Sequence, residues 1–386
     1  MNRGRHPLLI VGGGPAGLAA ALAARQRGIA PLVLERQRAP IDKACGEGIM
    51  PDGVAALRAL GVEPPGVDFR GIRYVDEGGV AEAPFPGAPG RGVRRTALHA
   101  AMVAAVEAAG IDVRWGTKVE AVSPDGEVRT GGETLVGEWV VGADGLLSHV
   151  RGWAGLAGAP PSGRDSARRF GVRRHFRLAP WSDLVEVHWR DGVEAYVTPV
   201  AADEVGIAML WNKERTRGDE QGQAGGNDGD GFDALLARFP EVRTRLGGAA
   251  ETSRDRGAGP FRQRARAVVR GRVVLIGDAA GYLDAITGEG LGLSFQQAHA
   301  LAAALASGDP TSYTATCRRL ARLSDALTEA LLFCERRPWL RRRLVRELGR
   351  RPALFSRLLG VHARQLSLRR VGVLAFGALL VGLLRG

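Results

Sequence analysis

The sequence predicts a mixed α/β fold in which a parallel-sheet domain, discontinuous along the chain, surrounds a β-rich insertion and precedes a helical region. Glycine-rich turns join strand patterns to helix patterns near both ends of the first 305 residues, and short strand patterns fill residues 170–210. At 386 residues and 45% hydrophobic, the chain can bury a large core in two or three domains. We expect residues 1–70, 91–165 and 262–305 in the first domain, 71–90 and 166–261 in the second, and 306–386 in the helical region.

The chain opens with a βαβ pattern. Leu8 to Val11 is an apolar run typical of a buried strand, and Pro15 to Arg27 is rich in alanine and predicts a helix. Gly28 is a suitable C-terminal stop for that helix, and Pro31 to Leu34 predicts the second strand. A helix is also expected from Arg94 to Ala109, followed by another strand.

The turn GGGPAG after the first strand has the glycine spacing of a dinucleotide-binding loop. Gly12 permits the tight turn, Gly14 lets backbone N–H groups approach a pyrophosphate, and Gly17 lets the helix pack closely on the sheet. The helix N-terminus at Pro15 and Ala16 adds a partial positive charge for the phosphates. The pattern therefore predicts a Rossmann-like domain, whereas an ordinary glycine turn is the plainer alternative.

An acid follows the second strand at the place that this motif requires. Glu35 lies 18 residues after Gly17, near the position of the carboxylate that binds a ribose hydroxyl. An acid here favours the adenosine of FAD or NAD over a 2′-phosphate. We assign Arg36, the next residue, to the same binding region; a surface glutamate is the plainer interpretation of Glu35.

Two later segments combine glycines with an acid in the same way. GADGLLSHVR follows a short strand and places Asp144 in a turn, and GDAAGYLDAITGEGLG follows the apolar run RVVLI. Asp278 could accept hydrogen bonds from the hydroxyls of a ribityl chain. A helix starting at Thr287 would direct its N–H groups at electron-rich flavin atoms. The cofactor-binding residues expected in this last turn are Gly288, Gly290 and Leu291.

The three segments, in this order, resemble those of the flavoprotein monooxygenases of the para-hydroxybenzoate hydroxylase type and their relatives, the geranylgeranyl reductases. The likeness extends from about Leu8 to Ala304. It implies a discontinuous, Rossmann-like FAD-binding domain, with FAD as cofactor and NADPH or NADH as co-substrate. The combination is specific for the fold and for FAD, and much less specific for the reaction.

The resemblance implies further contacts with FAD. In VRRTALHAAM, Arg95 and Leu98 match an Arg-x-x-Leu pattern whose arginine lies near the pyrophosphate. DKACGEGIMP is similar to the reductases' loop beside the isoalloxazine, which assigns Lys43, Cys45 and Gly46 to the flavin. The plainer alternatives are a solvated charge for Arg95 and a small buried side chain for Cys45.

Two other positions carry a less direct implication. The backbone of Val119 would bind the adenine. Asp144 would either take part in cofactor binding or bridge domains and assist the pyridine nucleotide.

Some residues depart from the related families. Ala285 stands where a proline usually precedes the Ile-Thr-Gly-Glu-Gly turn. Of the reductases' Tyr-x-Trp-x-Phe-Pro pattern, AYVTPV keeps only Tyr196 and Pro199, and the Trp-x-Trp-x-Ile-Pro motif of flavin halogenases is absent from the sequence. These departures favour an NAD(P)H- and O2-dependent monooxygenase. The alternatives are an isoprenoid reductase or dehydrogenase, and a flavin-bearing binding or redox-sensing protein.

The cofactor supplies the reactive chemistry in such an enzyme, so no catalytic triad or paired carboxylates are required. Tyr196, His188 and Asp284 are the polar candidates for contact with substrate, although each also has a structural interpretation. The three cysteines are widely spaced without a CxxC pair, which predicts no zinc site and no disulfide framework.

The net charge of +12 belongs to the C-terminal segment. Residues 336–386 hold thirteen arginines and one acid, whereas the preceding residues are neutral, which argues against a nucleic-acid enzyme. The apolar run Val371 to Leu384 has fourteen residues, too few to span a bilayer comfortably. We expect either a packed terminal helix or peripheral membrane contact through 360–386, with a lipophilic substrate. The apolar run at Leu8 is short for a secretion signal, so we expect none. The widely spaced cysteines predict a cytoplasmic protein, with the tail placing it at the inner face of the membrane if it contacts lipid.

Overall fold

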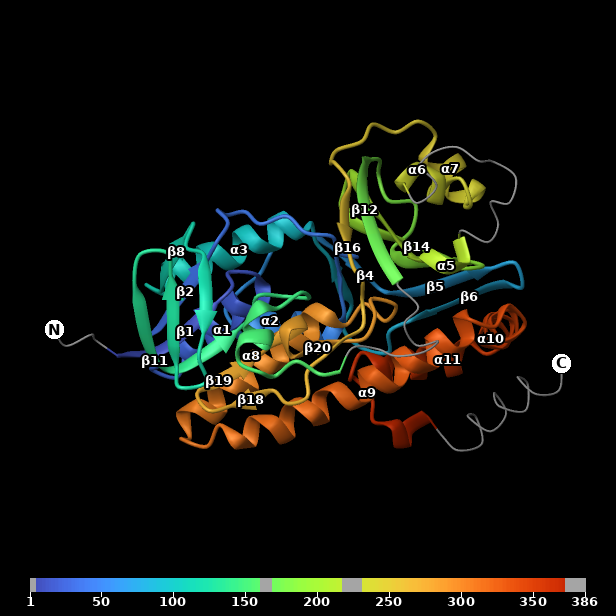
Figure 1. Ribbon diagram of the computed structural model, residues 1–386. Coiled ribbons are helices and arrows are strands. Elements are labelled where there is room, and N and C mark those ends of the chain that lie inside the picture. The colour runs from blue at the N-terminus through green and yellow to red at the C-terminus, as the bar shows by residue number, and fades with distance from the viewer. Residues whose placement is uncertain (1–4, 160–168, 217–230, 372–386) are drawn as a thin grey trace.

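The computed structural model describes residues 5–159, 169–216 and 231–371. Figure 1 shows two lobes, one built on a parallel sheet and the other on an antiparallel sheet, with the C-terminal helices running along both. The mixed α/β class predicted from the sequence is therefore confirmed.

The first lobe contains an eight-stranded sheet in which the N-terminal strand is central. Neighbouring strands from β19 to β8 run parallel, and β18, β10 and β9 extend the sheet in antiparallel pairs. The path of the sheet is β18 (Val269–Arg270), β19 (Val273–Leu275), β11 (Thr134–Gly142), β1 (His6–Val11), β2 (Pro31–Glu35) and β8 (Asp112–Trp115), with β10 (Glu127–Thr130) and β9 (Val119–Val122) attached to β11. The apolar runs of β1 and β2 are buried because helices cover the sheet.

The helices that contribute to the apolar core beside this sheet include α1 (Pro15–Arg25), α3 (Arg95–Ala108) and α8 (Gly290–Ala306). The first two confirm the predicted helices, each a little shorter than expected. Glycines with positive φ follow them at Gly28 and Gly110. The third helix begins later than Thr287, because Gly288 has a φ of 69°, which an α-helix does not accept.

The second lobe contains a seven-stranded sheet that is antiparallel except for one parallel pair, β13 with β5. Its strands, in order across the sheet, are β16 (Arg256–Ala258), β12 (Arg169–Arg177), β15 (Glu204–Asn212), β14 (Val193–Ala201), β13 (Leu184–Arg190), β5 (Gly71–Asp76) and β6 (Gly79–Pro84). One face packs on the short helices α6 (Phe232–Leu236) and α7 (Pro240–Leu246). The strands come from the two segments assigned to a β-rich domain.

The C-terminal helices join the two lobes. α9 (Thr311–Glu335) contributes Tyr313 and Cys317 to the core of the first lobe, and Leu323 and Leu331 further along it contact the core of the second. α10 (Pro338–Arg350) and α11 (Pro352–His362) pack on β6. The helical region is therefore a bridge between lobes as well as a terminal extension.

The first part of the predicted membrane segment belongs to this packed structure. Gly360 and Val361 are buried at the end of α11, and a Cβ at Gly360 would lie 2.5 Å from Pro86. The short helix η4 (Leu368–Val371) follows, and residues 372–386 lie outside the described residues. In the described parts of the chain, no helix is both long and apolar enough to cross a membrane.

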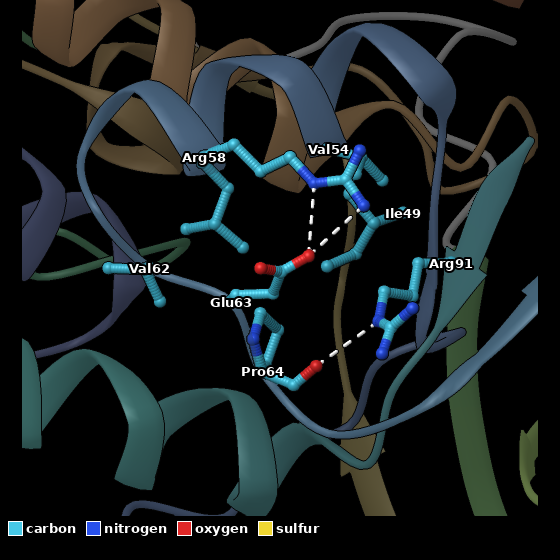
Figure 2. A pocket seen from close by; sticks show the side chains of 8 residues that line it. Ile49, Val54, Arg58, Val62, Glu63, Pro64 and Arg91 are labelled. Atoms are coloured by element: carbon cyan, nitrogen blue, oxygen red, sulfur yellow. Dashed lines mark hydrogen bonds and ion pairs between the residues drawn. The ribbon is translucent and has the colours of Figure 1, made fainter. Parts of the chain in front are cut away.

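The smaller elements are β3 (Gly48–Ile49), α2 (Pro51–Ala59), β4 (Val67–Phe69), β7 (Gly90–Gly92), α4 (His149–Trp153), α5 (Lys213–Thr216), β17 (Gln263–Arg264), η3 (Gly277–Ala280) and β20 (Gly281–Tyr282). Helix α2 lies against α8, where Gly53 and Gly292 meet so closely that a Cβ at Gly53 would be 2.8 Å from the Gly292 Cα. A cavity of about 10 Å³ is lined by residues that include Val54 and Arg91. Figure 2 shows the side chains around it. This volume holds about one water molecule, so the cavity is a packing gap and not a substrate site.

Candidate functional site: a dinucleotide groove facing a charged sheet

The glycine loop after β1 is shaped by two backbone contacts. A Cβ at Gly12 would lie 2.4 Å from the Ala143 carbonyl oxygen, and one at Gly17 would lie 1.9 Å from the Gly12 carbonyl oxygen. Gly14 differs, because no atom lies within 4 Å of the place its Cβ would occupy. The loop is therefore closed on the protein side at Gly12 and Gly17 and open at Gly14, as a cradle for a pyrophosphate requires.

Glu35 holds this loop in place from the end of β2. Its carboxylate accepts hydrogen bonds from the Gly13 N–H at 2.6 Å and from the Gln37 N–H at 2.8 Å. Each carboxylate oxygen has a second lone pair, so both bonds are compatible with a ribose hydroxyl as a further donor. Arg36 follows on the exposed side of the strand end.

His99 is a structural residue of the loop that motif reasoning did not identify. Its Nε2 lies 2.8 Å from the Gly13 carbonyl oxygen, and its Nδ1 accepts the Ile41 N–H at 3.4 Å. Burial lowers the pKa of His99. The neutral ring with its proton on Nε2 satisfies both contacts. The available signal was its position four residues after Arg95, on the same face of α3.

Arg95 is buried with an unsatisfied guanidinium. Its side chain is 4% exposed, and Nη1 has no hydrogen-bond partner. Burial lowers the pKa of Arg95, while nearby Cys45 and Glu47 oppose that change. A buried cation without a partner is costly. A phosphate group would satisfy it, so the residues present fit the pyrophosphate of FAD.

Charged side chains from four parts of the chain influence one another near the glycine loop. Burial raises the pKa of Asp278, against the influence of Lys43 and Arg95. Lys43 is exposed at the surface, yet desolvation by the surrounding protein lowers its pKa, against Glu35 and Asp278. These mutual influences show that predicted cofactor residues from separate motifs are neighbours in space.

The second motif is organised by its own acid. Asp144 accepts hydrogen bonds from the Ser148 hydroxyl at 2.5 Å and from the Val150 N–H at 3.0 Å, which fixes the turn before α4. Arg151, at the end of this motif, donates to the carbonyl oxygens of Asp278 and Ala279 at 3.3 and 3.1 Å. The structure thus gives Asp144 a local role, and it gives Arg151 the role of joining the second and third motifs.

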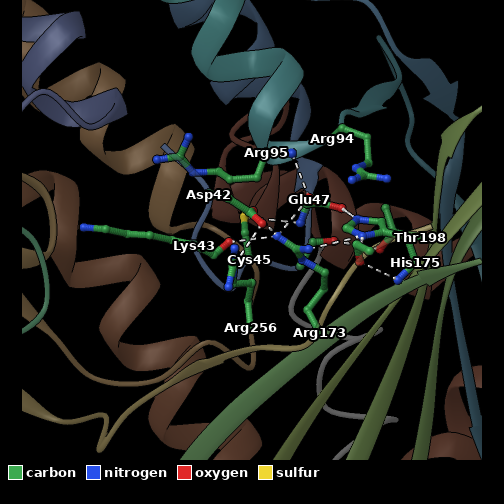
Figure 3. Close-up of polar contacts among 12 residues, drawn as sticks. Asp42, Lys43, Cys45, Glu47, Arg94, Arg95, Arg173, His175, Thr198 and Arg256 are labelled. Atoms are coloured by element: carbon green, nitrogen blue, oxygen red, sulfur yellow. Dashed lines mark hydrogen bonds and ion pairs between the residues drawn. The ribbon is translucent and has the colours of Figure 1, made fainter. Parts of the chain in front are cut away.

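The loop that carries Lys43 and Cys45 is anchored on the β-rich sheet through Glu47. Glu47 is 2% exposed and has a φ of 60°, which is strained for a residue with a side chain. Its carboxylate accepts the Arg95 N–H at 2.7 Å and bonds to His175 Nε2 on β12. Figure 3 shows these side chains together, with Arg173 beside them.

Further bonds attach the same loop to the sheet. Arg173 donates to Asp42 at 2.5 Å and to the Lys43 carbonyl oxygen at 3.1 Å, and Thr198 on β14 donates to the Gly46 carbonyl oxygen at 2.8 Å. The Cys45 thiol accepts the Glu47 N–H at 3.3 Å, and burial raises its pKa. The thiol is therefore kept in its neutral form, in contrast to a reactive thiolate.

On the substrate side, Tyr196 and Asp284 belong to one buried network. Arg169 binds Asp284 at 2.8 Å and Glu194 at 3.1 Å, and Glu335 of α9 lies 3.9 Å from the same guanidinium. The Tyr196 hydroxyl lies 3.0 Å from both Glu194 Oε2 and the Ile286 carbonyl oxygen.

The surroundings of Glu194 in this network favour its protonated form. Burial raises the pKa of Glu194 to about 7, although Arg169 opposes the change. The Tyr196 hydroxyl has one proton and faces two acceptors. A protonated Glu194 resolves this, because it donates to the Tyr196 oxygen while Tyr196 donates to Ile286.

His188 lies on the other face of the sheet. In the antiparallel pair of β13 and β14, Tyr196 is opposite Val187, and His188 is opposite Ala195. Successive side chains of a strand point to opposite faces. His188 contacts Glu186 at 3.0 Å and Glu241 of α7 at 3.4 Å. The structure therefore does not bring His188 together with Tyr196 and Asp284.

The remaining predicted residues lie at the ends of secondary-structure elements. Val119 begins β9, and Gly290 and Leu291 form the first turn of α8 after the positive-φ turn at Gly288. Glu289 is 3.3 Å from His362 of α11. Burial disfavours the imidazolium, but Glu289 outweighs this effect and raises the pKa of His362. The turn expected to face the flavin is thus bonded to the C-terminal helices.

The chain belongs to the FAD binding domain family, whose match covers residues 5–309. This confirms the predicted FAD-dependent flavoprotein fold and its resemblance to flavoprotein monooxygenases. Menaquinone reductase of Mycolicibacterium smegmatis is 27% identical over 80% of this chain and 78% of its own length. The FAD-dependent monooxygenase OpS4 of Beauveria bassiana is 31% identical over 61% of this chain and 63% of its own length.

Solved structures show the same fold. PqsL of Pseudomonas aeruginosa, in complex with 2-aminobenzoylacetate, has a TM-score of 0.71 at 20% identity, covering 87% of this chain and 98% of that one. 2-Methyl-3-hydroxypyridine-5-carboxylic acid oxygenase has a TM-score of 0.67 at 21% identity, covering 86% of this chain and 93% of that one.

Proposed function

We propose that the protein is an FAD-dependent monooxygenase that uses NADH or NADPH and O2 to hydroxylate a lipophilic or aromatic small molecule. When bound, FAD supplies the electron transfer and the activation of oxygen. The protein binds the pyrophosphate with Arg95 and the glycine loop, and the ribose with Glu35. It also excludes water and orients the substrate.

One observation carries this proposal. Both segments expected at the flavin ring are bonded to the same face of the β-rich sheet, through Thr198 to Gly46 and through Tyr196 to Ile286. A substrate molecule on that face of the sheet would therefore lie beside the isoalloxazine ring of FAD. Enclosed placement of this kind is the main contribution that a protein makes to flavin chemistry.

The character of the face supports a lipophilic substrate. Between the groups around Arg169 and Arg173, the same face carries Gly171, where a Cβ would meet Leu210 at 3.0 Å and Phe261 at 3.1 Å. The ring of Phe261 packs edge-on against Tyr282 of the third motif, with centroids 5.7 Å apart. Apolar and aromatic surface flanked by a few charged groups is typical of small-molecule sites. The names of OpS4 and the pyridine carboxylic acid oxygenase support oxygen insertion.

A reductase acting on a quinone or isoprenoid is the second candidate. The Lys43-Ala44-Cys45-Gly46 loop and the likeness to mycobacterial menaquinone reductases over about four fifths of the chain favour it. The lost Tyr-x-Trp-x-Phe-Pro pattern around Tyr196 opposes it. Both candidates place a lipophilic molecule on the same face of the sheet.

The decisive experiment measures NADH and NADPH oxidation together with O2 uptake, using an aromatic acid, a 2-aminobenzoyl compound and a prenylated naphthoquinone as substrates. A monooxygenase consumes one O2 per NAD(P)H and incorporates ¹⁸O from ¹⁸O2 into the product, detected by mass spectrometry. Reduction of the quinone under anaerobic conditions, without ¹⁸O in any product, would instead establish the reductase. Turnover with no compound in a broad lipid panel would favour a binding or sensing role.

We propose that the protein acts in the cytoplasm or at the inner face of the membrane. The buried part of the segment from Gly360 to Val371 leaves residues 372–386 as the portion proposed to contact lipid. Removing these residues and measuring membrane association in cell fractions tests this placement.

A further inference from the structure

The last turn of α9 and the first turn of α10 each carry an exposed aromatic side chain. Phe333 and Trp339 are 51% and 55% exposed, although both residue types are usually buried. Among the described residues, Trp153 in the first lobe is the other exposed large aromatic, at 37%. We refer to residues 333–351 as the basic corner.

The charge exposed on the basic corner has one sign. The segment holds eight arginines and two acids. The acids, Glu335 and Glu347, are 1% and 6% exposed, so neither presents a negative surface. Arg341 is also buried, where it pairs with Asp76. The other seven arginines are exposed or partly exposed.

Helix α10 separates these groups from the protein core. Val345 and Leu348 are buried in the apolar cluster shared with β6. Trp339, Arg343 and Arg346 follow one another at spacings of four and three residues, which places them on one side of the helix. Arg342 and Arg350 also lie at helical spacing from these residues, but Arg342 pairs with Glu77 and Arg350 pairs with Glu347 at 2.9 Å. The inner face of α10 therefore stabilises the fold, and its outer face combines tryptophan with arginine.

The aromatic rings are arranged as they are at membrane interfaces. The guanidinium of Arg337 lies 3.7 Å from the centroid of the Phe333 ring, and that of Arg343 lies 5.4 Å from the Trp339 ring. Each ring thus has a cation near one face, while about half of the residue remains exposed. Stacking on nucleic-acid bases needs free ring faces. Insertion among lipid headgroups needs an amphipathic ring beside a cation.

From these observations we infer that the basic corner is a docking surface for a membrane rich in anionic lipid. Arginines near such a surface are attracted to its negative potential, and the aromatic edges add an apolar contribution. This surface lies within the packed helices and is distinct from residues 372–386.

The corner is joined to the proposed substrate face. Glu335, two residues after Phe333, binds Arg215 at 2.7 Å and faces Arg169 of the network behind Tyr196. Docking through the corner therefore brings the β-rich lobe to the lipid surface, where lipophilic molecules concentrate. The docking itself does not depend on which reaction the flavin performs.

The test is co-sedimentation of the full-length, FAD-loaded protein with large unilamellar vesicles. Vesicles of 70% phosphatidylcholine and 30% phosphatidylglycerol should bind the protein, and pure phosphatidylcholine vesicles should bind it much less. Binding should fall steeply as NaCl is raised from 0.05 to 0.5 M, because salt screens exposed charges. The double variant R343A/R346A should weaken binding by about 25-fold, since each arginine near an anionic surface contributes roughly a fivefold factor. Trp339→Ala should weaken it further.

Matched variants elsewhere test whether position matters. R58A/R177A removes the same two charges from exposed arginines outside the corner, and Trp153→Ala removes an exposed tryptophan. Both should bind vesicles as the unchanged protein does, and the flavin absorbance of every variant should remain normal.

Three outcomes would overturn the inference. The first is that the protein binds both vesicle types equally well. The second is that R58A/R177A weakens vesicle binding as much as R343A/R346A does. The third is that binding is lost when residues 372–386 are removed but is unchanged in R343A/R346A. Tighter binding to single-stranded DNA than to the anionic vesicles would likewise assign the corner to nucleic acid.

Discussion

The dinucleotide groove and the facing sheet are built in opposite ways. In the groove, Gly12 and Gly17 let backbone touch backbone, and the polar contacts of Glu35 are made to main-chain N–H groups. On the sheet, the buried Arg169 guanidinium bonds to the side chains of both Glu194 and Asp284. The cofactor end thus depends on where side chains are missing, and the substrate end depends on which side chains meet. Substitutions should affect the two ends differently.

The largest effect is expected from Arg169→Met. The variant leaves Glu194 and Asp284 buried without their common cation, which should lower the free energy of unfolding by about 3–5 kcal/mol. Chemical denaturation measures the change. The matched control is Arg70→Met, because Arg70 and Asp183 form an exposed pair, 53% and 60% accessible, that contributes under about 1 kcal/mol. Equal losses in the two variants would contradict a role for burial.

The pH dependence of stability should reveal the proton on Glu194. Its pKa is raised from 4.5 to about 7 in the folded state. The folded protein therefore holds the proton while the unfolded chain releases it. The corresponding stability is complete below pH 4.5 and is lost progressively up to about pH 7, by roughly 3 kcal/mol in total. Glu194→Gln cannot titrate, so its unfolding free energy should decline less over this interval. Parallel curves for the two proteins between pH 5 and 8 would refute the assignment.

Arg95→Met should have effects of opposite sign on the cofactor-free and cofactor-bound protein. Without a phosphate, the substitution removes a buried cation whose Nη1 has no partner, so the FAD-free protein should become more stable. With FAD, a hydrogen bond to a charged group is lost, which should weaken binding by about 1.5–3 kcal/mol. Fluorescence titration with FAD and denaturation of the FAD-free protein measure both. A variant destabilised in both states would show that Arg95 acts as a purely structural residue.

Gly17→Ala tests the backbone contact of the groove. The added methyl group would overlap the Gly12 carbonyl oxygen, so we expect a loss of about 1–3 kcal/mol in stability together with weaker FAD binding. Gly152→Ala is the matched control, because no atom lies within 4 Å of its Cβ position. Flavin content after purification and denaturation curves check both variants. Full FAD occupancy in Gly17→Ala would show that the loop can relax.

The smallest changes in KM and stability should come from single substitutions on the two faces of the β-rich sheet. Tyr196→Phe removes the hydroxyl between Glu194 and Ile286, and it should raise KM for the substrate more than it lowers stability, a loss of about 1 kcal/mol. His188→Gln lies on the face against α7 and should leave KM unchanged within about twofold, the accuracy of such comparisons. The ratio of the two KM changes, measured on the same substrate, locates the substrate face. A larger change at His188 would place the substrate on the α7 face.

The sequence-based predictions succeeded where backbone contacts are local and failed where side chains from distant segments meet. The βαβ unit, the glycine loop and Glu35 could be predicted because each depends on neighbours within about 20 residues. His99 and Arg151 were missed, since their partners Gly13 and Asp278 lie 86 and 127 positions away in the sequence. His188 and Tyr196 were treated alike from sequence. Strand register separates them, because it sends successive side chains to opposite faces.

Taken by itself, the sequence determined the class of fold, the cofactor and the basic C-terminal segment, because glycine spacing, apolar periodicity and net charge are properties of the linear chain. Only the tertiary structure decided that Glu47 anchors the flavin-side loop to His175, and that Glu194 shares Arg169 with Asp284. It likewise decided that the charges left outside on α10 are all positive. Burial and partner choice are set when distant segments pack, and they determine which charged groups are neutralised and which keep a proton.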